Sequence, residues 1–384
     1  MKRKAVLIGL TAAVAITAAT RAPRGGHELP VYPSYYPHEI EISAVPPADA
    51  SGLLLDGKMH AYVGSAPRFA GTPGDAIRSI ESLGAFITIR VNPSSPRARE
   101  DASACAVVRA VARAVAGEGN VIIHPYPVTP FHGDYLYHAD VVAEAAARVL
   151  GGKAAPAIQD LKVQDLKVRA FGTVAGRLAA SHTAASDWDV EVEETGASEL
   201  VLARTTAING WLGPPELRAG WYQAYLVLAD ALDANTRESV DGTLQRLRSG
   251  ELAQPAERIN LERALVAELI GGCRKVVIGY TIKREYFNAE FSAGIENIAH
   301  DALAGLHAPM FLRTVKLKDF PWNGWLALGI DAQPTAAWNP IAGFTDGFGR
   351  LMWFGLADPA ELPSPYDSTW MLNRISDVEA MPRR

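Results

Sequence analysis

Apolar and polar residues follow two alternating periods over residues 59–150, and the change of period outlines the expected elements. Short apolar runs rich in β-branched residues predict strands at 59–63, 85–91 and 120–124. Apolar residues three or four positions apart predict helices at 75–84, 102–117 and 140–152. The first two helices are expected to begin near Thr72 and Ser95, which precede prolines. This alternation predicts βαβ units on a parallel or mixed sheet that helices cover.

The pattern changes after residue 152. Alternating apolar and polar residues between glycine-bearing turns predict antiparallel strands at 167–176, 187–196 and 199–210. From residue 214 to 307 the spacing is mostly helical, with one apolar run at 275–282 that is either a buried strand or the end of the preceding helix, and we favour the strand. The expected fold class is therefore α/β to α+β: an N-terminal βαβ-type domain followed by a second domain of antiparallel strands and helices.

These patterns divide the chain into five segments. The α/β domain is expected at 57–152 and the α+β domain at 153–308. An arm rich in proline and tyrosine occupies 25–56, and its short alternating run Glu-Ile-Glu-Ile at 39–42 is expected to add an edge strand. Residues 309–384 form an aromatic, loop-rich C-terminal extension. Residues 1–24 are expected to be a signal peptide or a short membrane anchor.

The N-terminus indicates export. Lys2 to Lys4 form a basic segment, and the apolar stretch from Ala5 to about Thr20 is shorter than the roughly 20 residues of a membrane-spanning helix. We therefore expect a periplasmic or other extracytoplasmic protein. The alternative is an uncleaved segment that anchors the protein in the inner membrane.

Composition narrows the classes of partner and site. The chain has 48% hydrophobic residues, 21% charged residues and a formal net charge of -5, so it lacks the basic excess of a nucleic-acid-binding protein. Its only cysteines, Cys105 and Cys273, exclude a four-cysteine zinc site. Helical spacing around Cys105 favours a buried thiol, and a single bridge to Cys273 is the alternative in an oxidising compartment.

Ligands of open α/β sheets bind beyond the carboxyl ends of the strands, so the loops that follow the predicted strands are the candidate binding regions. Two loops carry hydroxyl and guanidinium groups that suit a small anion and are expected to converge: Ser65 and Arg68 in one, and Ser94, Ser95 and Arg97 in the other. Helix capping explains the same serines equally well. No complete phosphate-binding or dinucleotide-binding motif is present.

The third loop gathers histidines and aspartates over residues 124–138. If the chain turns at Gly133 and a helix follows, Asp134 and His138 share one face and can chelate a divalent metal such as zinc. His124, at the strand end, would be a third ligand, and His132 a fourth ligand or a proton shuttle. The alternative is a capped loop stiffened by prolines, because this spacing matches no familiar zinc motif.

Two functional hypotheses follow. The first is an exported ligand-binding or accessory protein, for a small anionic ligand or an envelope protein partner, with membrane association through the N-terminus. The second is a metal-dependent enzyme or metal carrier that uses the 124–138 cluster. Loop tryptophans of the C-terminal extension either stack on a ligand or cover a core: Trp322, Trp325, Trp338, Trp353 and Trp370. The chain lacks the motifs of serine hydrolases, zincins and c-type cytochromes.

Overall fold

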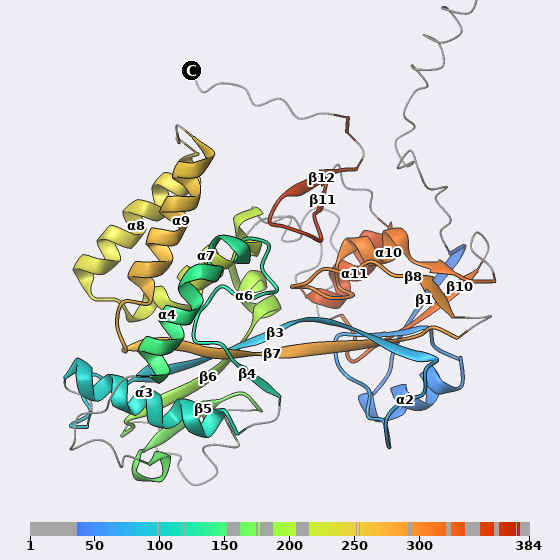
Figure 1. The fold of residues 1–384 in the computed structure, drawn as a ribbon. Coiled ribbons are helices and arrows are strands. Elements are labelled where there is room, and N and C mark those ends of the chain that lie inside the picture. Colours follow the sequence, from blue (N-terminus) through green and yellow to red (C-terminus); the bar gives the residue numbers. More distant parts are fainter. Residues whose placement is uncertain are drawn as a thin grey trace, which may run out of the picture.

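A mixed sheet of eight strands organises the computed structural model of the protein, with strand order β1-β10-β2-β7-β3-β6-β5 and β4 paired with β7 (Figure 1). Its strands are β1 (Glu39–Ala44), β2 (Ala61–Val63), β3 (Ile77–Val91), β4 (Val121–Ile123), β5 (Val168–Phe171), β6 (Val190–Gly196), β7 (Lys275–Asn288) and β10 (Trp325–Ile330). The structure describes residues 37–97, 100–117, 120–151, 162–173, 176, 187–204, 215–250, 252, 254–290, 294–319, 324–334, 346–356, 361–373 and 375–376.

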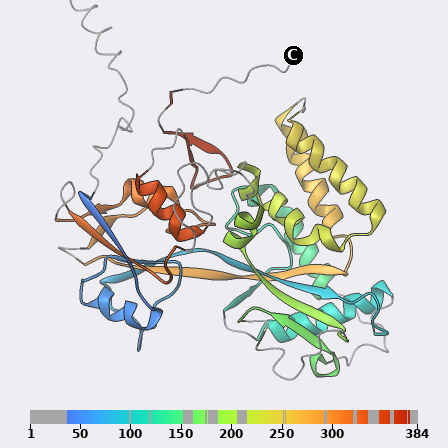
Figure 2. The ribbon, with the colours of Figure 1, turned by 180° about the vertical axis from the view of Figure 1, so that it is seen from behind.

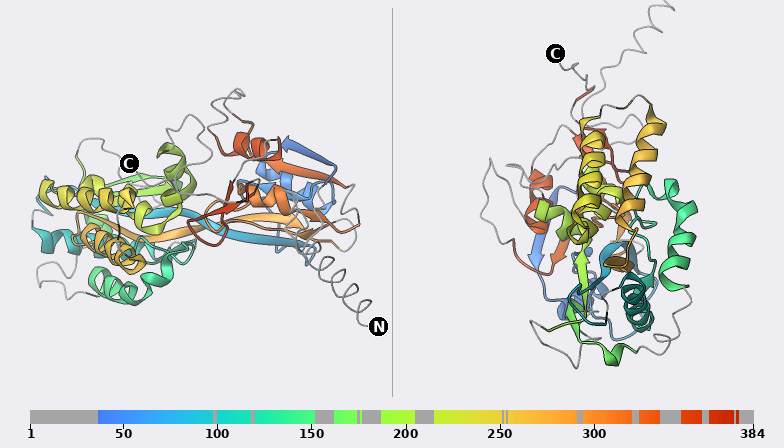
Figure 3. Two further views of the ribbon diagram at one scale, coloured as in Figure 1. Left: turned by 90° about the horizontal axis from the view of Figure 1, so that it is seen from above. Right: turned by 90° about the vertical axis from the view of Figure 1, so that its left-hand side faces the viewer.

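The long strands β3 and β7 run through both halves of the molecule, which lie side by side along them (Figures 1 and 3). The helices are α2 (Pro47–Leu55), α3 (Asp101–Val115), α4 (Ala139–Leu150), α6 (Ala197–Arg204), α7 (Gly220–Leu228), α8 (Ala234–Ser249), α9 (Pro255–Leu269), α10 (Pro309–Thr314) and α11 (Gly347–Leu356). Two small sheets accompany them, β8 (Ile295–Asn297) with β9 (Lys316–Leu317), and β11 (Glu361–Pro363) with β12 (Trp370–Leu372).

Each half of the sheet is buried on both faces, where the described residues form four apolar clusters. In the half that holds β4, β5 and β6, Ile87 and Ile89 pack under α3, while Phe86 faces the cluster built by α7, α8 and α9. In the other half, Tyr62 packs with α2, and Val63 packs with α10 and β10. Adjacent residues of a strand point to opposite faces, so sheet burial on both sides explains the continuous apolar runs of β3 and β7. Figure 2 shows both halves from behind.

The predicted α/β class is confirmed, and so is the mixed sheet. Strands β2, β3 and β4 are each antiparallel to β7 and therefore run in the same direction as one another. Helix α3 connects β3 to β4 across β7, and α4 follows β4, as the alternating periods predicted. The run at 275–282 lies in β7, and the alternating piece of the N-terminal arm forms β1 at the sheet edge.

The helix expected at 75–84 is wrong, since this segment is the first part of β3. Its apolar residues are spaced as in a helix, but Ile77 packs with the α2 cluster and Ile80 with the α10 cluster on the opposite face. A strand buried on both faces accepts an apolar residue at any position. Apolar residues three positions apart therefore do not distinguish a helix from such a strand. The next helix also begins later than expected, at Asp101.

Two expectations for residues 153–308 also need correction. Strands β5 and β6 pair in parallel, although β6 is antiparallel to β3, so this part of the sheet is not purely antiparallel. Helix α6 occupies the first part of the strand expected at 199–210, and residues 205–210 lie outside the described residues. One sheet takes strands from the arm, both predicted domains and the C-terminal extension.

Cys105 and Cys273 form a disulfide, so the alternative to a buried thiol is the correct one. Their Cα atoms are 5.1 Å apart, and the bond ties α3 to the chain just before β7. Both residues belong to the cluster on the α3 face of the sheet. Structural disulfides form in oxidising compartments, which agrees with the expected export.

No helix within the described ranges combines the length and the apolar composition that a membrane-spanning helix needs. Residues 1–36 lie outside those ranges.

Candidate functional site

The loop after β4, which connects Ile123 to α4, is held by its own side chains. His124 Nε2 donates to the carbonyl oxygen of Val128 at 3.0 Å, which closes the loop around its prolines. Burial lowers the pKa of His124, so its ring is neutral near pH 7. The Tyr126 hydroxyl lies 2.7 Å from His138 Nδ1, and burial likewise lowers the pKa of His138. Neutral rings fit both arrangements, because each has one nitrogen that donates and one that accepts.

His132 joins the loop to α7. Its Nδ1 accepts from the backbone N–H of Thr129 at 3.0 Å, which requires the tautomer with its proton on Nε2. That proton is then donated to Gln223 Oε1 at 3.0 Å, and the Gln223 amide donates to the carbonyl oxygen of Leu217. Both His132 and Gln223 are buried. His132 therefore connects the loop after β4 to α7 through its two ring nitrogens.

Asp134 caps α7 although it lies 86 residues before that helix in the chain. Its two carboxylate oxygens accept from the backbone N–H groups of Gly220 at 2.9 Å and Trp221 at 3.1 Å. These N–H groups have no partner within the helix, and the helix N-terminus attracts negative charge. Close packing explains Gly220, because a Cβ atom there would lie 2.5 Å from Val128 Cγ1.

The predicted zinc site is therefore not assembled. His132 and Asp134 use both of their polar side-chain atoms to hold the loop and α7, and His124 uses its Nε2. The fourth predicted ligand, His138, is fully buried against Tyr126, and its Nε2 has no hydrogen-bond partner among the residues that the structure describes. Throughout the described residues, no group of three or more His, Cys, Asp or Glu side chains could hold a metal ion. The alternative prediction of a capped loop is also not met as made, because α4 has no side-chain cap at its N-cap residue His138 and Asp134 caps α7 instead.

The two loops predicted to bind an anion do not converge. Tyr62, just before the first loop, pairs with Tyr286 of β7, whereas the second loop begins beside Arg274. At about 3.3 Å per residue, these points are about 40 Å apart along the strand. The two loops lie far apart because β7 extends through both halves of the molecule. In a smaller sheet the ends of β2 and β3 would lie close together.

The residues of these loops also have other roles. The buried hydroxyl of Ser95 donates to Asp189 Oδ1, and the Arg97 guanidinium faces the same carboxylate at 3.9 Å. The Ser94 backbone N–H donates to Asn92 Oδ1 in a turn. In the other half, the Arg68 backbone N–H donates to Pro47 O, and Ser65 is partly buried in the loop after β2.

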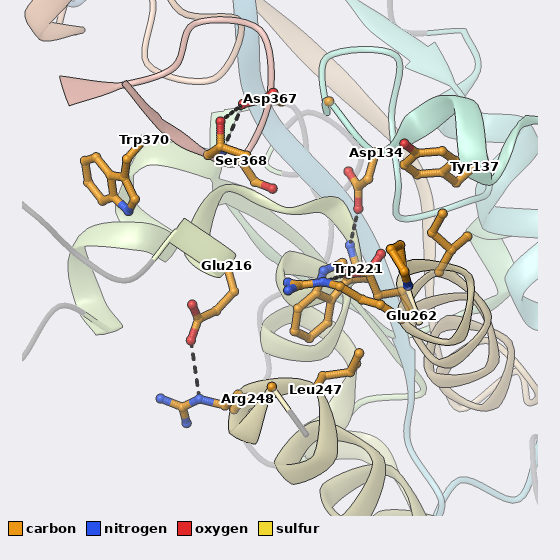
Figure 4. A pocket seen from close by; sticks show the side chains of 16 residues that line it. Asp134, Tyr137, Glu216, Trp221, Leu247, Arg248, Glu262, Asp367, Ser368 and Trp370 are labelled. Carbon is orange, nitrogen blue, oxygen red and sulfur yellow. Dashed lines mark hydrogen bonds and ion pairs between the residues drawn. The ribbon is translucent and has the colours of Figure 1, made fainter. Parts of the chain in front are cut away.

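A pocket of about 620 Å³ lies between the loop after β4, the helices α7–α9 and the β11–β12 hairpin (Figure 4). It is lined by Gly133, Asp134, Tyr137, Glu216, Trp221, Leu247, Arg248, Gly250, Pro255, Arg258, Ile259, Glu262, Asp367, Ser368, Thr369 and Trp370. Pockets of this size accommodate small organic molecules. Because the lining comes from four separate parts of the chain, the tertiary fold alone creates the pocket.

The floor of the pocket is buried and the rim is open. Trp221, Leu247 and Glu262 lie in the buried floor, where burial raises the pKa of Glu262. The exposed ring of Tyr137 and the partly exposed ring of Trp370 stand at the rim. Figure 4 shows Trp370 on the hairpin side and Tyr137 on the loop side.

A close backbone approach fixes the hairpin against the loop. A Cβ atom at Gly133 would lie 2.6 Å from Asp367 Cα, so only glycine allows the two turns to touch. Within the hairpin turn, Asp367 Oδ1 accepts from the Thr369 backbone N–H at 2.9 Å. Burial opposes ionisation of Asp367, but hydrogen bonds from Thr369 hold its pKa below the usual value. The hairpin is thus a structured wall of the pocket.

Sequence reasoning identified only part of this pocket. Trp370 was among the tryptophans expected either to stack on a ligand or to cover a core, and Asp134 was named for a different role. Trp322 and Trp338 lie outside the described residues. Arg258 and Glu262 are four positions apart on a predicted helix and form an ion pair there, which in sequence looks like an ordinary surface pair.

Comparisons with known proteins found no matching family model and no matching curated protein. Solved structures with a similar course of the chain include NikZ from Campylobacter jejuni in complex with Ni(L-His), with a TM-score of 0.36, 13% identity and coverage of 66% of this chain and 56% of that one. AgaA from A. tumefaciens R10, in complex with agropinic acid, has a TM-score of 0.38 and 13% identity, and 71% of this chain and 59% of that chain are covered.

The periplasmic EDTA-binding protein EppA gives a TM-score of 0.36 and 11% identity, with 73% of this chain and 56% of that chain covered. The chain thus spans little more than half the length of these three proteins. At these scores the likeness concerns general architecture, and no residue role is transferred from them.

Proposed function

We propose that the protein is an exported ligand-binding protein and that the pocket between the β11–β12 hairpin and α7–α9 is its binding site. The observation that carries the proposal is the pocket itself, which combines aromatic planes, a buried polar floor and a volume of about 620 Å³. A concave site with an apolar lining and a few convergent polar groups is the usual form of a small-molecule site.

Two features support an extracytoplasmic location. The basic and apolar N-terminal stretch has the pattern of an export signal, and the Cys105–Cys273 disulfide suits an oxidising compartment. The same N-terminal stretch supports an envelope location. There, residues 1–24 would associate with the membrane, and an envelope protein could be the partner.

The small anion expected from the loops after β2 and β3 is not part of this proposal. Ser95 and Arg97 already face Asp189, and the loop that carries Ser65 and Arg68 lies in the other half of the molecule. A metal-dependent activity likewise has no assembled ligand set within the described part of the chain. A small-molecule site in the pocket therefore has better support than an anion site or a metal site.

Two substitutions on α9 test the site. Ile259 lines the pocket, so Ile259→Trp fills it, whereas Asn260→Trp adds the same side chain at the exposed neighbouring position outside it. We expect native mass spectrometry of protein purified from its own compartment to detect a small molecule on the wild type and on Asn260→Trp. Ile259→Trp should lose that molecule. Retention of the molecule by a folded Ile259→Trp variant would place the binding site elsewhere.

A further inference from the structure

Charge is unevenly distributed around the pocket. Its lining contains four carboxylates, those of Asp134, Glu216, Glu262 and Asp367, against the two guanidinium groups of Arg248 and Arg258. Both guanidinium groups already face carboxylates in the lining. Arg248 Nε lies 3.4 Å from Glu216, and Arg258 Nε lies 2.9 Å from Glu262. Neither arginine therefore offers its full charge to an anionic ligand.

The positive end of α7 is not available to an anion either. Asp134 accepts from both leading N–H groups of that helix, Gly220 and Trp221, with its two oxygens. A ligand carboxylate at this place would have to displace a buried carboxylate from its two donors. Like charges held close together in a partly buried site repel each other strongly.

Glu262 is a buried carboxylate of the pocket, and only one of its two oxygens accepts a hydrogen bond from a described residue. Its residue is only 6% exposed, and one carboxylate oxygen accepts from Arg258 Nε. The other oxygen receives no hydrogen bond from any residue that the structure describes. This oxygen is not sealed from solvent, so a donor that enters the pocket can reach it. Hydrogen bonds from cationic donors to a carboxylate are stronger than those from neutral donors. Loss of hydration on burial raises the pKa of Glu262, although its hydrogen bond with Arg258 opposes that rise.

Three aromatic residues line the same pocket as Glu262. Buried Trp221 lies between Trp370 and Tyr137, which stand on opposite sides of the pocket in Figure 4. The faces of such rings attract cations and at the same time bury an apolar ligand body. An anion gains nothing from the ring faces. The rings and the carboxylates therefore favour the same type of ligand.

We propose that the pocket selects organic cations, ligands with an ammonium or guanidinium group on an apolar body, and that the unused oxygen of Glu262 binds that group. This inference rests on the proposed function, because it assigns the ligand class of the same pocket. The cationic nitrogen donates to Glu262 in the floor, and the apolar body contacts Trp370 and Tyr137 at the rim.

Three probes of similar shape and different charge test this selection by isothermal titration calorimetry at ~150 mM salt: 2-phenylethylammonium, 2-phenylethanol and 3-phenylpropionate. We expect 2-phenylethylammonium to bind about tenfold or more tighter than 2-phenylethanol, and 3-phenylpropionate to bind most weakly. Failure of 2-phenylethylammonium to bind, or tighter binding of 3-phenylpropionate, overturns the inference.

Glu262→Gln keeps the shape of the side chain and removes its charge. It should weaken binding of 2-phenylethylammonium about tenfold while changing that of 2-phenylethanol less than about twofold. Glu257→Gln is the matched control, because Glu257 lies on the same helix, pairs with Arg246 and does not line the pocket. An unchanged affinity of Glu262→Gln for 2-phenylethylammonium overturns the inference.

Tyr137→Leu is a second variant that does not depend on the buried floor, since Tyr137 is 50% exposed. Loss of its ring face should weaken 2-phenylethylammonium about threefold more than 2-phenylethanol; an equal loss for both counts against the cation. If 3-phenylpropionate binds and Ile259→Trp abolishes that binding, the pocket is a ligand site with the opposite charge preference. In that case this inference fails and the proposed function stands.

Discussion

At the scale of single residues, burial determines the charge of the histidines in the loop after β4. His124 and His138 have lowered pKa values because the protonated rings would lose hydration. In the unfolded chain both rings titrate near their ordinary value of about 6.5. Below that pH the unfolded state therefore binds more protons than the folded state, and the free energy of unfolding decreases as the pH falls.

The pH dependence can be measured by urea unfolding at about pH 7.5 and about pH 5.5. We expect the wild type to lose stability on acidification, and His138→Gln to lose about 1 kcal/mol less, since one depressed group contributes up to about 1.4 kcal/mol per pH unit. His38→Gln changes an exposed histidine and serves as the control. The same loss on acidification in His138→Gln and in the wild type would show that His138 is protonated in the folded protein.

At the scale of elements, the loop after β4 and α7 form one unit because Asp134 caps the helix from a distant part of the chain. Removal of this carboxylate leaves two buried N–H groups without an acceptor. Each unsatisfied buried group costs roughly 1–3 kcal/mol. The cap also holds Trp221 in the pocket floor, so its loss should reach the binding site.

We expect Asp134→Ala to lower the free energy of unfolding by about 2–4 kcal/mol in urea titrations. The matched control is Asp233→Ala, which removes the exposed cap of α8 that accepts from Asn235 and Thr236. Water can replace that exposed acceptor, so the control should lose clearly less stability. Equal losses in the two variants would contradict the role of the buried cap.

Elements with one clear period were predictable, and the rest were not. Helix α3 shows its spacing locally although its start was misplaced, α9 begins with a proline, and the cysteine bridge was one of two stated alternatives. The first part of β3 was missed because Ile77 and Ile80 are buried on opposite faces, which imitates helical spacing. The pocket could not be predicted from the sequence, because its lining joins segments as far apart as Gly133 and Trp370, which are 237 positions from each other.

At the scale of the whole molecule, β3 and β7 join two halves that each bury both faces of the sheet. The disulfide closes a loop of 168 residues in the half that holds the pocket. A loop of that length gives about 5 kcal/mol in the chain-entropy model, although measured values are commonly about 2–4 kcal/mol. The pocket walls α7–α9 and the hairpin therefore rest on a sheet that is covalently braced.

A crystal structure of the protein purified from its own compartment would show whether this pocket holds a small organic molecule. We expect density for an organic molecule between Trp370 and the pocket floor, with a nitrogen within hydrogen-bond distance of Glu262. Density for such a molecule at another place, with the pocket holding water alone, would contradict this expectation.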